Sequence, residues 1–226
     1  MRIATAFACT AFVAGIYAPA TLLAADNKIT PTLTSVEVIN HGKKMTITRG
    51  HDPNATIPSF FSRPDRGCPP FCVQPMHVAP GVETIGELDV LNYLKRAGEG
   101  DASILVVDSR TPDWVMRGTI PGSVNIPWTE LSQETGTFET PTEAKNIDHV
   151  LRDQLGAQKT DRGWDYSHAK TLVMFCNGLW CHQSSLNILT LLKRGYPADK
   201  IKWYRGGMQD WVSVGLTTVT PPADSE

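Results

Sequence analysis

The sequence predicts an α/β fold with a mostly parallel central sheet flanked by helices and a small β-rich N-terminal extension. Three short apolar runs have the length and composition of strands buried on both faces: residues 104–107, 171–175 and 201–204. Helical patterns alternate with these runs, at residues 84–97, 140–155, 184–193 and 208–214. Strands that alternate with helices are typical of a layered fold with parallel strands.

Side chains mark the ends of several expected helices. Thr84 and Glu87 have the spacing of a capping box, ahead of an apolar face formed by Ile85, Leu88, Leu91 and Leu94. Thr140 and Pro141, with Glu143 in the first turn, are expected to begin a second helix. The apolar face of that helix would consist of Ile147, Val150, Leu151 and Leu155. Two glycines are expected to end helices: Gly98 and Gly195.

The N-terminal third has a different pattern. Residues 32–48 alternate and are rich in β-branched side chains around His41-Gly42, which predicts a hairpin. Seven prolines between residues 53 and 81 exclude a long helix there. We therefore expect a small β-rich module and Pro-rich linker over residues 26–81, followed by the main domain over residues 82–220.

Residues 1–25 are typical of a secretory signal peptide. Arg2 precedes an uncharged apolar stretch, and small residues follow it near the expected cleavage site: Ala18, Ala20, Ala24 and Ala25. Cleavage would remove Cys9, so that four of the five cysteines remain. We expect a mature protein of the oxidising periplasm, without stable insertion in the membrane.

Composition narrows the classes of function. Hydrophobic residues make up 41% of the chain, which is enough to form a core and excludes global disorder. The formal net charge of −2 argues against a nucleic-acid partner, since such proteins normally carry an excess of basic residues.

Polar residues follow two of the expected buried strands, where ligands bind in sheets of this kind. Asp108-Ser109-Arg110 follow the first strand, and Cys176 follows the second. The loop after Cys176 runs into a helix and consists of Asn177, Gly178, Leu179, Trp180, Cys181, His182, Gln183 and Ser184. Backbone N–H groups and the helix dipole at such a position favour an anion, so Cys176 is expected to ionise readily and act as a nucleophile. The alternative is a structural cysteine, buried or joined to Cys181.

Three segments of this chain resemble the rhodanese family: Asp108-Ser109-Arg110, residues 118–127 (GTIPGSVNIP) and residues 203–211 (WYRGGMQDW). The first two look like the family's D-x-R turn and its G-H-I-P-G-A-x-N-I-P segment, and the third like its L-x-G-G-x-x-x-W signature. The resemblance covers about residues 82–217 and places Cys176 at the position of the family's nucleophile. It implies a rhodanese-like fold and sulfurtransferase chemistry.

In that chemistry Cys176 takes a sulfane sulfur from a donor and passes it, as a persulfide, to a thiol acceptor that is a small molecule or a protein thiol. The donor would be thiosulfate-like, a thiosulfonate or a polysulfide. The cycle needs no metal and no organic cofactor. The loop N–H groups from Asn177 to Ser184 would stabilise the persulfide, while Asp108 and Arg110 hold the architecture of the cleft, either as a buried ion pair or in a turn.

The chain also departs from the family. Gln183-Ser184 stand where single-domain rhodaneses commonly place an Arg before Ser or Thr, and Thr119 replaces the usual His. Trp180 would cover an apolar pocket or simply pack at the surface, and His182 would supply a charge at low pH or only form a hydrogen bond.

Cys181 leaves a second function open. Five residues after Cys176, it has the place of a resolving thiol, which would make the protein a thiol–disulfide redox enzyme. Phosphate hydrolysis or arsenate reduction, and a non-catalytic binding module, remain further alternatives.

Cys68 and Cys72 form a second close pair, separated by Pro69-Pro70-Phe71. A polyproline II conformation would hold the two Cα atoms roughly 12 Å apart, so a disulfide requires a tight turn. We expect that disulfide in an oxidising compartment. With Met76 and His77 the pair also makes a soft ligand set that suits Cu(I). A third reading places this segment over the Cys176 loop, where it would exchange electrons or sulfur with Cys176.

Overall fold

In the computed structural model, the described residues are 27–221 without 51, 53, 69–70, 134–141 and 144–146. The expected signal peptide, Thr140 and Pro141 lie outside them. Within the described part of the chain, no helix combines the length and the apolar character needed to cross a membrane.

The centre of the molecule is a five-stranded sheet in the order β3-β11-β10-β4-β5, and every pair of neighbours is parallel. Its strands are β3 (Glu83–Thr84), β4 (Ile104–Asp108), β5 (Val124–Asn125), β10 (Thr171–Phe175) and β11 (Ile201–Tyr204). The three strands predicted from apolar runs are confirmed as β4, β10 and β11. The prediction omitted β3 and β5 because two residues are too few to show a pattern.

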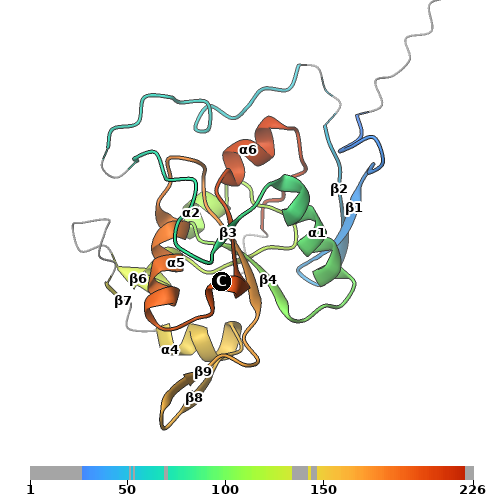
Figure 1. Ribbon diagram of the computed structural model, residues 1–226. Helices are drawn as coiled ribbons and strands as arrows, with labels where there is room; N and C mark the ends of the chain where they lie inside the picture. Colours follow the sequence, from blue (N-terminus) through green and yellow to red (C-terminus); the bar gives the residue numbers. More distant parts are fainter. Residues whose placement is uncertain are drawn as a thin grey trace, which may run out of the picture.

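Two layers of helices sandwich this sheet (Figure 1). Alternate residues of β10 face opposite sides: Leu172 and Met174 belong to one buried cluster, and Val173 and Phe175 to the other. The first cluster includes side chains of α3 (Trp128–Leu131), α4 (Ile147–His149), η1 (Val150–Gln154) and α5 (Gln183–Lys193). The second includes side chains of α1 (Glu87–Gly98) and α6 (Gly207–Ser213). Two-sided burial explains why these strands are continuously apolar.

Two expected helix starts are wrong. The N-cap of α1 is Gly86, whose N–H donates to Asp89 Oδ2 at 3.1 Å, whereas Thr84 lies in β3. The second helix begins only at Ile147, and Thr142–Glu143 form strand β7, which pairs with β6 (Ser132–Gln133). Local capping patterns were outweighed in both cases by strand pairing, which a sequence pattern does not reveal.

The remaining short elements lie between the main ones. They are helix α2 (Pro112–Val115), the 3-10 turn η2 (Ala198–Lys200) and an antiparallel pair, β8 (Gln158–Thr160) and β9 (Gly163–Asp165). The other predicted helices match the structure closely: α5 ends at Lys193, just before Gly195, and α6 covers the last expected helix.

The N-terminal hairpin is confirmed as β1 (Val36–Asn40) and β2 (Lys43–Ile47). Both turn residues have positive φ, 46° at His41 and 74° at Gly42, as a tight two-residue hairpin requires. Three apolar side chains of the hairpin are buried in the same cluster as α1 and the sheet: Val36, Val38 and Ile47. The chain after β2 also pairs with the C-terminal end, where Thr217 N donates to Thr48 O at 3.1 Å.

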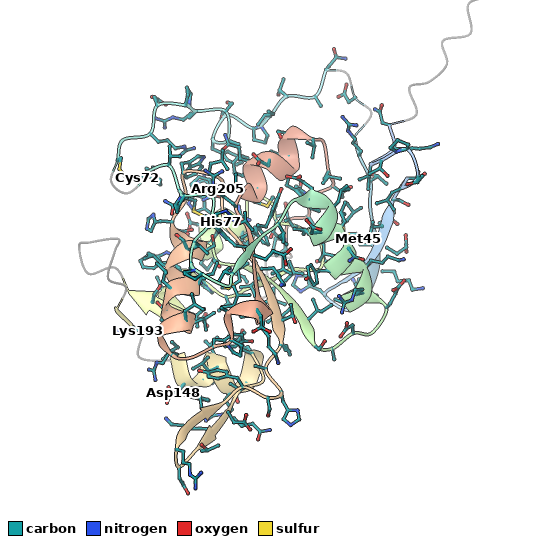
Figure 2. The ribbon with its side chains drawn as sticks, in the orientation of Figure 1. Met45, Cys72, His77, Asp148, Lys193 and Arg205 are labelled. Carbon is teal, nitrogen blue, oxygen red and sulfur yellow. A yellow bond between two sulfur atoms is a disulfide. The ribbon has the colours of Figure 1, made fainter. Side chains whose placement is uncertain are left out.

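The segment between β2 and β3 has no helix or strand among its described residues. It leaves the hairpin and runs past α6, α2 and α5 towards β3 (Figure 1). We call residues 58–68 and 71–78 of this segment the strap. Figure 2 shows Cys72 of the strap at the upper left, His77 nearer the centre of the molecule and Asp148 below both.

Candidate active site

Cys176 directly follows β10, at the edge where three strands end together. Phe175 pairs with Asp108 of β4 on one side and with Tyr204 of β11 on the other. The Cys176 carbonyl accepts a hydrogen bond of 3.0 Å from Met208 N. A Cβ on Gly207, whose φ is 56°, would lie only 2.3 Å from that carbonyl oxygen. The glycine pair after β11 therefore lets α6 begin directly against the cysteine loop.

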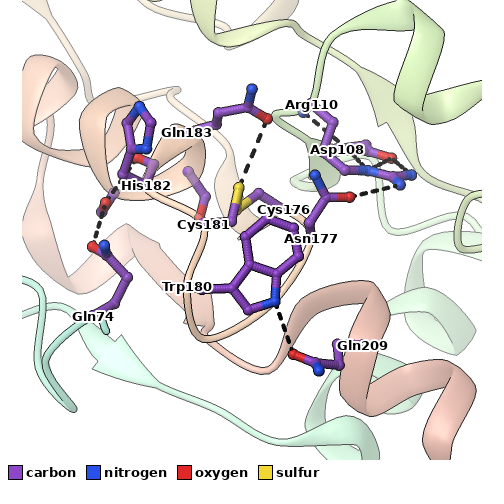
Figure 3. Close-up of a disulfide and its surroundings, with 12 residues drawn as sticks. Gln74, Asp108, Arg110, Cys176, Asn177, Trp180, Cys181, His182, Gln183 and Gln209 are labelled. Carbon is purple, nitrogen blue, oxygen red and sulfur yellow. Dashed lines mark hydrogen bonds and ion pairs between the residues drawn. A yellow bond between two sulfur atoms is a disulfide. The ribbon is translucent and has the colours of Figure 1, made fainter. Parts of the chain in front are cut away.

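Cys176 and Cys181 are joined by a disulfide across this loop, with 6.3 Å between their Cα atoms (Figure 3). The N–H of Cys181 donates to Gly178 O at 2.9 Å, which closes the turn between the two cysteines. Each cysteine is only 3% exposed and packs with Trp180. The structure thus holds the candidate nucleophile in its oxidised form, sheltered from solvent.

Trp180 is held from three directions. Its Nε1 donates to Gln209 Oε1 at 3.0 Å, and the ring of Phe71 meets it edge-on at 5.4 Å between centroids. The Arg66 guanidinium lies 3.4 Å from the centre of the indole ring. Desolvation lowers the pKa of Arg66 below its ordinary value, and the charge of Arg63 adds to this, but a guanidinium still stays protonated. Trp180 therefore covers the cysteine pair rather than an empty pocket, and Arg66 brings a positive charge to its ring.

The strap is fastened to the cysteine loop by a backbone hydrogen bond, and side chains next to the loop add further bonds to the strap. Gln74 N donates to Leu179 O at 2.8 Å, and the Arg205 guanidinium donates to the carbonyl of Gln74 at 2.7 Å. Gln209, which accepts from Trp180, donates its Nε2 to Phe61 O at 2.8 Å. The hypothesis that this segment lies over the cysteine loop is confirmed in its geometry. An exchange of electrons or sulfur between the segment and Cys176 stays a hypothesis.

Asp108 and Arg110 form a fully buried ion pair behind the loop, with 2.6 Å between Arg110 Nη2 and Asp108 Oδ2. Thr119, in the place of the family's His, donates its hydroxyl to the same carboxylate at 2.7 Å. Arg110 Nη1 also donates to Asn177 Oδ1 at 3.3 Å, so that the pair supports the loop. Since the carboxylate neutralises the guanidinium, Arg110 serves architecture rather than attraction of an anion.

The other predicted loop residues face different surroundings. The Ser184 hydroxyl accepts from Trp203 Nε1 at 3.1 Å, which ties the start of α5 to the sheet. His182 is 8% exposed, and its ring lies 6.5 Å from that of Trp128. Gln183 Oε1 lies 3.8 Å from Cys181 Sγ. Gly178 is buried and Leu179 half-buried within the turn.

Cys68 and Cys72 are joined by the second disulfide, with 4.7 Å between Cα atoms. Phe71 N donates to Gly67 O at 3.3 Å, which is the tight turn that a short disulfide needs. The copper hypothesis needs Cys68 and Cys72 as thiolate ligands, and the disulfide takes up both of their sulfurs. Across the described residues, no cluster of three or more His, Cys, Asp or Glu side chains is arranged to hold a metal ion.

Sequence reasoning did not assign the aromatic residues around the loop: Phe71, Trp114 and Trp128. Two of them had a usable signal, because Trp114 follows the Asp108 turn closely and Trp128 follows the end of the 118–127 motif at the same edge of the sheet. Arg66 and Phe71 lie in a Pro-rich segment without periodicity, so no pattern connected them to Cys176.

A parallel α/β sheet with a cysteine loop between the central strand and a helix defines a class of cysteine-dependent domains. A sequence model described as the rhodanese-like domain matches residues 91–214, more than half of the chain. The chain therefore belongs to the rhodanese-like domain family.

One curated relative is the sulfur carrier protein TtuD of Thermus thermophilus, 24% identical over 190 residues. The match covers 78% of this chain but only 58% of that protein's length. Among solved structures, a polysulfide-sulfur transferase homodimer from Wolinella succinogenes is 16% identical, with a TM-score of 0.40. It covers 66% of this chain and 86% of that one. A thiosulfate sulfurtransferase from Pseudomonas aeruginosa is 18% identical, with a TM-score of 0.39. The match covers 62% of this chain and 21% of that one.

Proposed function

We propose that this protein is a periplasmic sulfurtransferase that carries sulfane sulfur on Cys176 and rests with Cys176 joined to Cys181. The observation that carries the proposal is the position of Cys176 at the end of β10, with its carbonyl held by α6 and α5 beginning a few residues later. Membership of the rhodanese-like family and the sulfur-transfer names of its relatives support it. Two disulfides in so short a chain suit the oxidising compartment that the signal peptide predicts.

The cycle starts with the opening of the disulfide. Two equivalents of an external thiol reduce it, so that one disulfide of that thiol forms and Cys176 and Cys181 gain a proton each. The Cys176 thiolate then attacks the outer sulfur of a thiosulfonate or polysulfide, and the donor leaves as a sulfinate or a polysulfide shorter by one sulfur. An acceptor thiolate removes the outer sulfur of the Cys176 persulfide and regenerates the Cys176 thiolate.

Intact mass spectrometry tests this proposal. The protein is reduced, freed of reductant and incubated with thiosulfate, a thiosulfonate or polysulfide. We expect a gain of about 32 Da, one sulfur bound covalently, in the wild type and in Cys181→Ala. We expect no gain in Cys176→Ala. A reduced, folded wild type that gains no sulfur from any of the three donors would contradict the proposal.

The disulfide itself favours a second candidate, a thiol–disulfide redox enzyme. In that case each catalytic cycle opens and re-forms the Cys176–Cys181 bond. Cys181→Ala would then lose all activity towards thiols and disulfides. Sulfur loading that persists in Cys181→Ala separates the two functions.

A further inference from the structure

A small pocket opens beside the cysteine loop and has a volume of about 200 Å³. Its lining residues are Phe71, Trp114, Trp128, Asn177, Cys181, His182 and Gln183. They come from four places: the strap, α2, the start of α3 and the cysteine loop. Typical pockets for drug-sized molecules start at about 300 Å³, so this pocket admits only a smaller molecule.

The two disulfide sulfurs are placed differently with respect to this pocket. Cys181 is a lining residue, whereas Cys176, which the structure also describes, is not. Gln183 lines the pocket as well, and its Oε1 lies 3.8 Å from Cys181 Sγ (Figure 3). Trp180 packs on the cysteine pair and is fixed by Gln209 and Arg66, so it closes the approach on its side.

We propose that this pocket binds a small thiol, which opens the disulfide by attacking Cys181 Sγ and releases Cys176 as a thiolate. The assignment rests on the proposed function in one respect, that Cys176 is the thiol to be freed for sulfur transfer. It makes Cys181 a catalytic residue of the activating step and the aromatic pocket its binding site.

The step balances as an ordinary thiol–disulfide exchange. The thiolate of the small thiol forms a bond to Cys181 Sγ, the Cys176–Cys181 bond breaks, and its electron pair leaves on Cys176. A second thiol of the same class then attacks the mixed disulfide, which frees Cys181 and yields the oxidised small molecule. The direction of the first attack follows from access, because Cys181 lines the pocket and Cys176 does not.

The lining residues indicate the chemical class of the thiol. Three aromatic side chains supply apolar walls, and the polar groups are two amides and one imidazole. No Lys, Arg, Asp or Glu is among the lining residues that the structure describes. Arg110 is buried and neutralised by Asp108, so it adds no net charge beside the pocket. A small thiol with an uncharged body fits these walls better than a large thiol with several charges.

Trapping of the mixed disulfide tests the direction of attack. The oxidised full-length mature protein is mixed with limiting 2-mercaptoethanol, quenched with an excess of N-ethylmaleimide and mapped by peptide mass spectrometry. We expect the mercaptoethanol adduct on Cys181 and the maleimide on Cys176. The opposite distribution, or an even one, would overturn the proposal.

The role of the pocket is tested by the rate of opening with 2-mercaptoethanol and with glutathione. The Cys68–Cys72 bond of the same molecules, in which Cys68 is exposed and Cys72 half-buried, serves as an internal reference for the reactivity of each thiol. We expect 2-mercaptoethanol to be favoured over glutathione at least fivefold at Cys176–Cys181, relative to that reference. Equal ratios at the two disulfides would contradict a selective pocket.

A matched pair of strap variants completes the test. Phe71→Ala removes a pocket wall and should reduce the preference for 2-mercaptoethanol to less than twofold, whereas Val73→Ala, two residues away and 82% exposed, should leave it unchanged. Loss of the preference in both variants would overturn the pocket assignment. Because no sulfur donor is present, these results are independent of sulfur loading: an adduct on Cys181 in a protein that never loads sulfur supports this inference and refutes the proposed sulfur transfer.

Discussion

The two disulfides of this protein have nearly the same spacing in the sequence and opposite surroundings. Cys68 and Cys72 lie in the strap, where Cys68 is exposed and the chain forms neither helix nor strand. Cys176 and Cys181 lie at the end of the central strand and are almost completely buried. The strap disulfide closes a turn, while the loop disulfide lies among groups that fix its backbone and cover its sulfurs. The two pairs therefore differ in their surroundings and not in the kind of bond that joins them.

The strap disulfide nevertheless acts on the loop through its neighbours. Phe71, enclosed between Cys68 and Cys72, contacts Trp180 and lines the pocket at Cys181. Arg66 approaches the same indole ring from the other end of the turn. A turn fixed by a covalent bond thus presents two side chains to the loop that holds Cys176 and Cys181. A Pro-rich segment without that bond would hold these side chains less firmly.

The largest expected difference between the two regions is in sulfur transfer. Cys176→Ser should lower the rate by about 10³-fold or more, because the covalent intermediate loses its sulfur nucleophile. The double variant Cys68→Ser/Cys72→Ser should lose less than about tenfold, since it changes only the support of the strap. Transfer from a thiosulfonate to a small thiol, followed spectrophotometrically with pre-reduced protein, measures both. Equal losses would show that the strap pair takes part in the chemistry.

The next difference is in the ion pairs of the two regions. Asp108→Asn leaves Arg110 buried without a counter-charge and should destabilise the fold by about 3–5 kcal/mol. The matched variant is Asp65→Asn in the strap, where the Arg63–Asp65 pair is exposed and screened by solvent. It should leave the free energy of unfolding essentially unchanged. Urea denaturation of both variants compares them, and a small effect of Asp108→Asn would mean that the buried pair contributes little to the support of the loop.

A glycine in each region gives a third, smaller contrast. Gly207→Ala forces a Cβ against Cys176 O at a positive φ and should destabilise the protein by about 2–3 kcal/mol. Gly67→Ala in the strap meets nothing within 4 Å and should change stability by less than about 0.5 kcal/mol. Urea midpoints measure both, and the proposed sulfur loading of Gly207→Ala should be slower because its new atom displaces the Cys176 carbonyl. Identical midpoints would mean that the loop does not depend on close contact with α6.

The buried loop was predictable from sequence to a much greater extent than the strap. Cys176, Asp108 and Arg110 follow continuous apolar strands, and parallel strands necessarily end at one edge, so their proximity follows from the pattern. The glycines before Met208 belong to a recognisable motif. Each of these signals is local in the sequence and is preserved in the fold.

The strap gave no such signal. Its prolines exclude a long helix but do not predict where the segment lies. Its position depends on hydrogen bonds to Leu179 and Arg205, more than 100 residues later. The same reason explains the error at Thr84, which pairs with the distant Trp203, whereas Thr142–Glu143 form a local pair with Ser132–Gln133. The Cys176–Cys181 bond was an open alternative because spacing alone does not fix the direction of two side chains.

The smallest contrast concerns pH. Burial raises the pKa of Asp210 in α6, and the nearby Glu87 charge adds to this, whereas the hydrogen bond from Arg63 lowers the pKa of Asp65 in the strap. A raised carboxyl pKa favours the protonated form in the folded state, so the stability tied to Asp210 is present at low pH and is lost as pH rises through its folded pKa. For Asp65 the sign is opposite: the contribution is present above the unfolded pKa and is lost as pH falls through the folded value.

Asp210→Asn should therefore gain stability relative to the wild type between about pH 3 and pH 7, by less than about 1 kcal/mol because the carboxylate is partly exposed to solvent. Asp65→Asn should show a slight relative loss over the same interval, since a fully exposed pair is strongly screened. Thermal unfolding of the three proteins at several pH values gives both differences. If the stability of both variants relative to the wild type changes in the same direction with pH, the electrostatic surroundings of Asp210 and Asp65 are not opposite. The contrast between α6 and the strap would then hold for the disulfides but not for the charges.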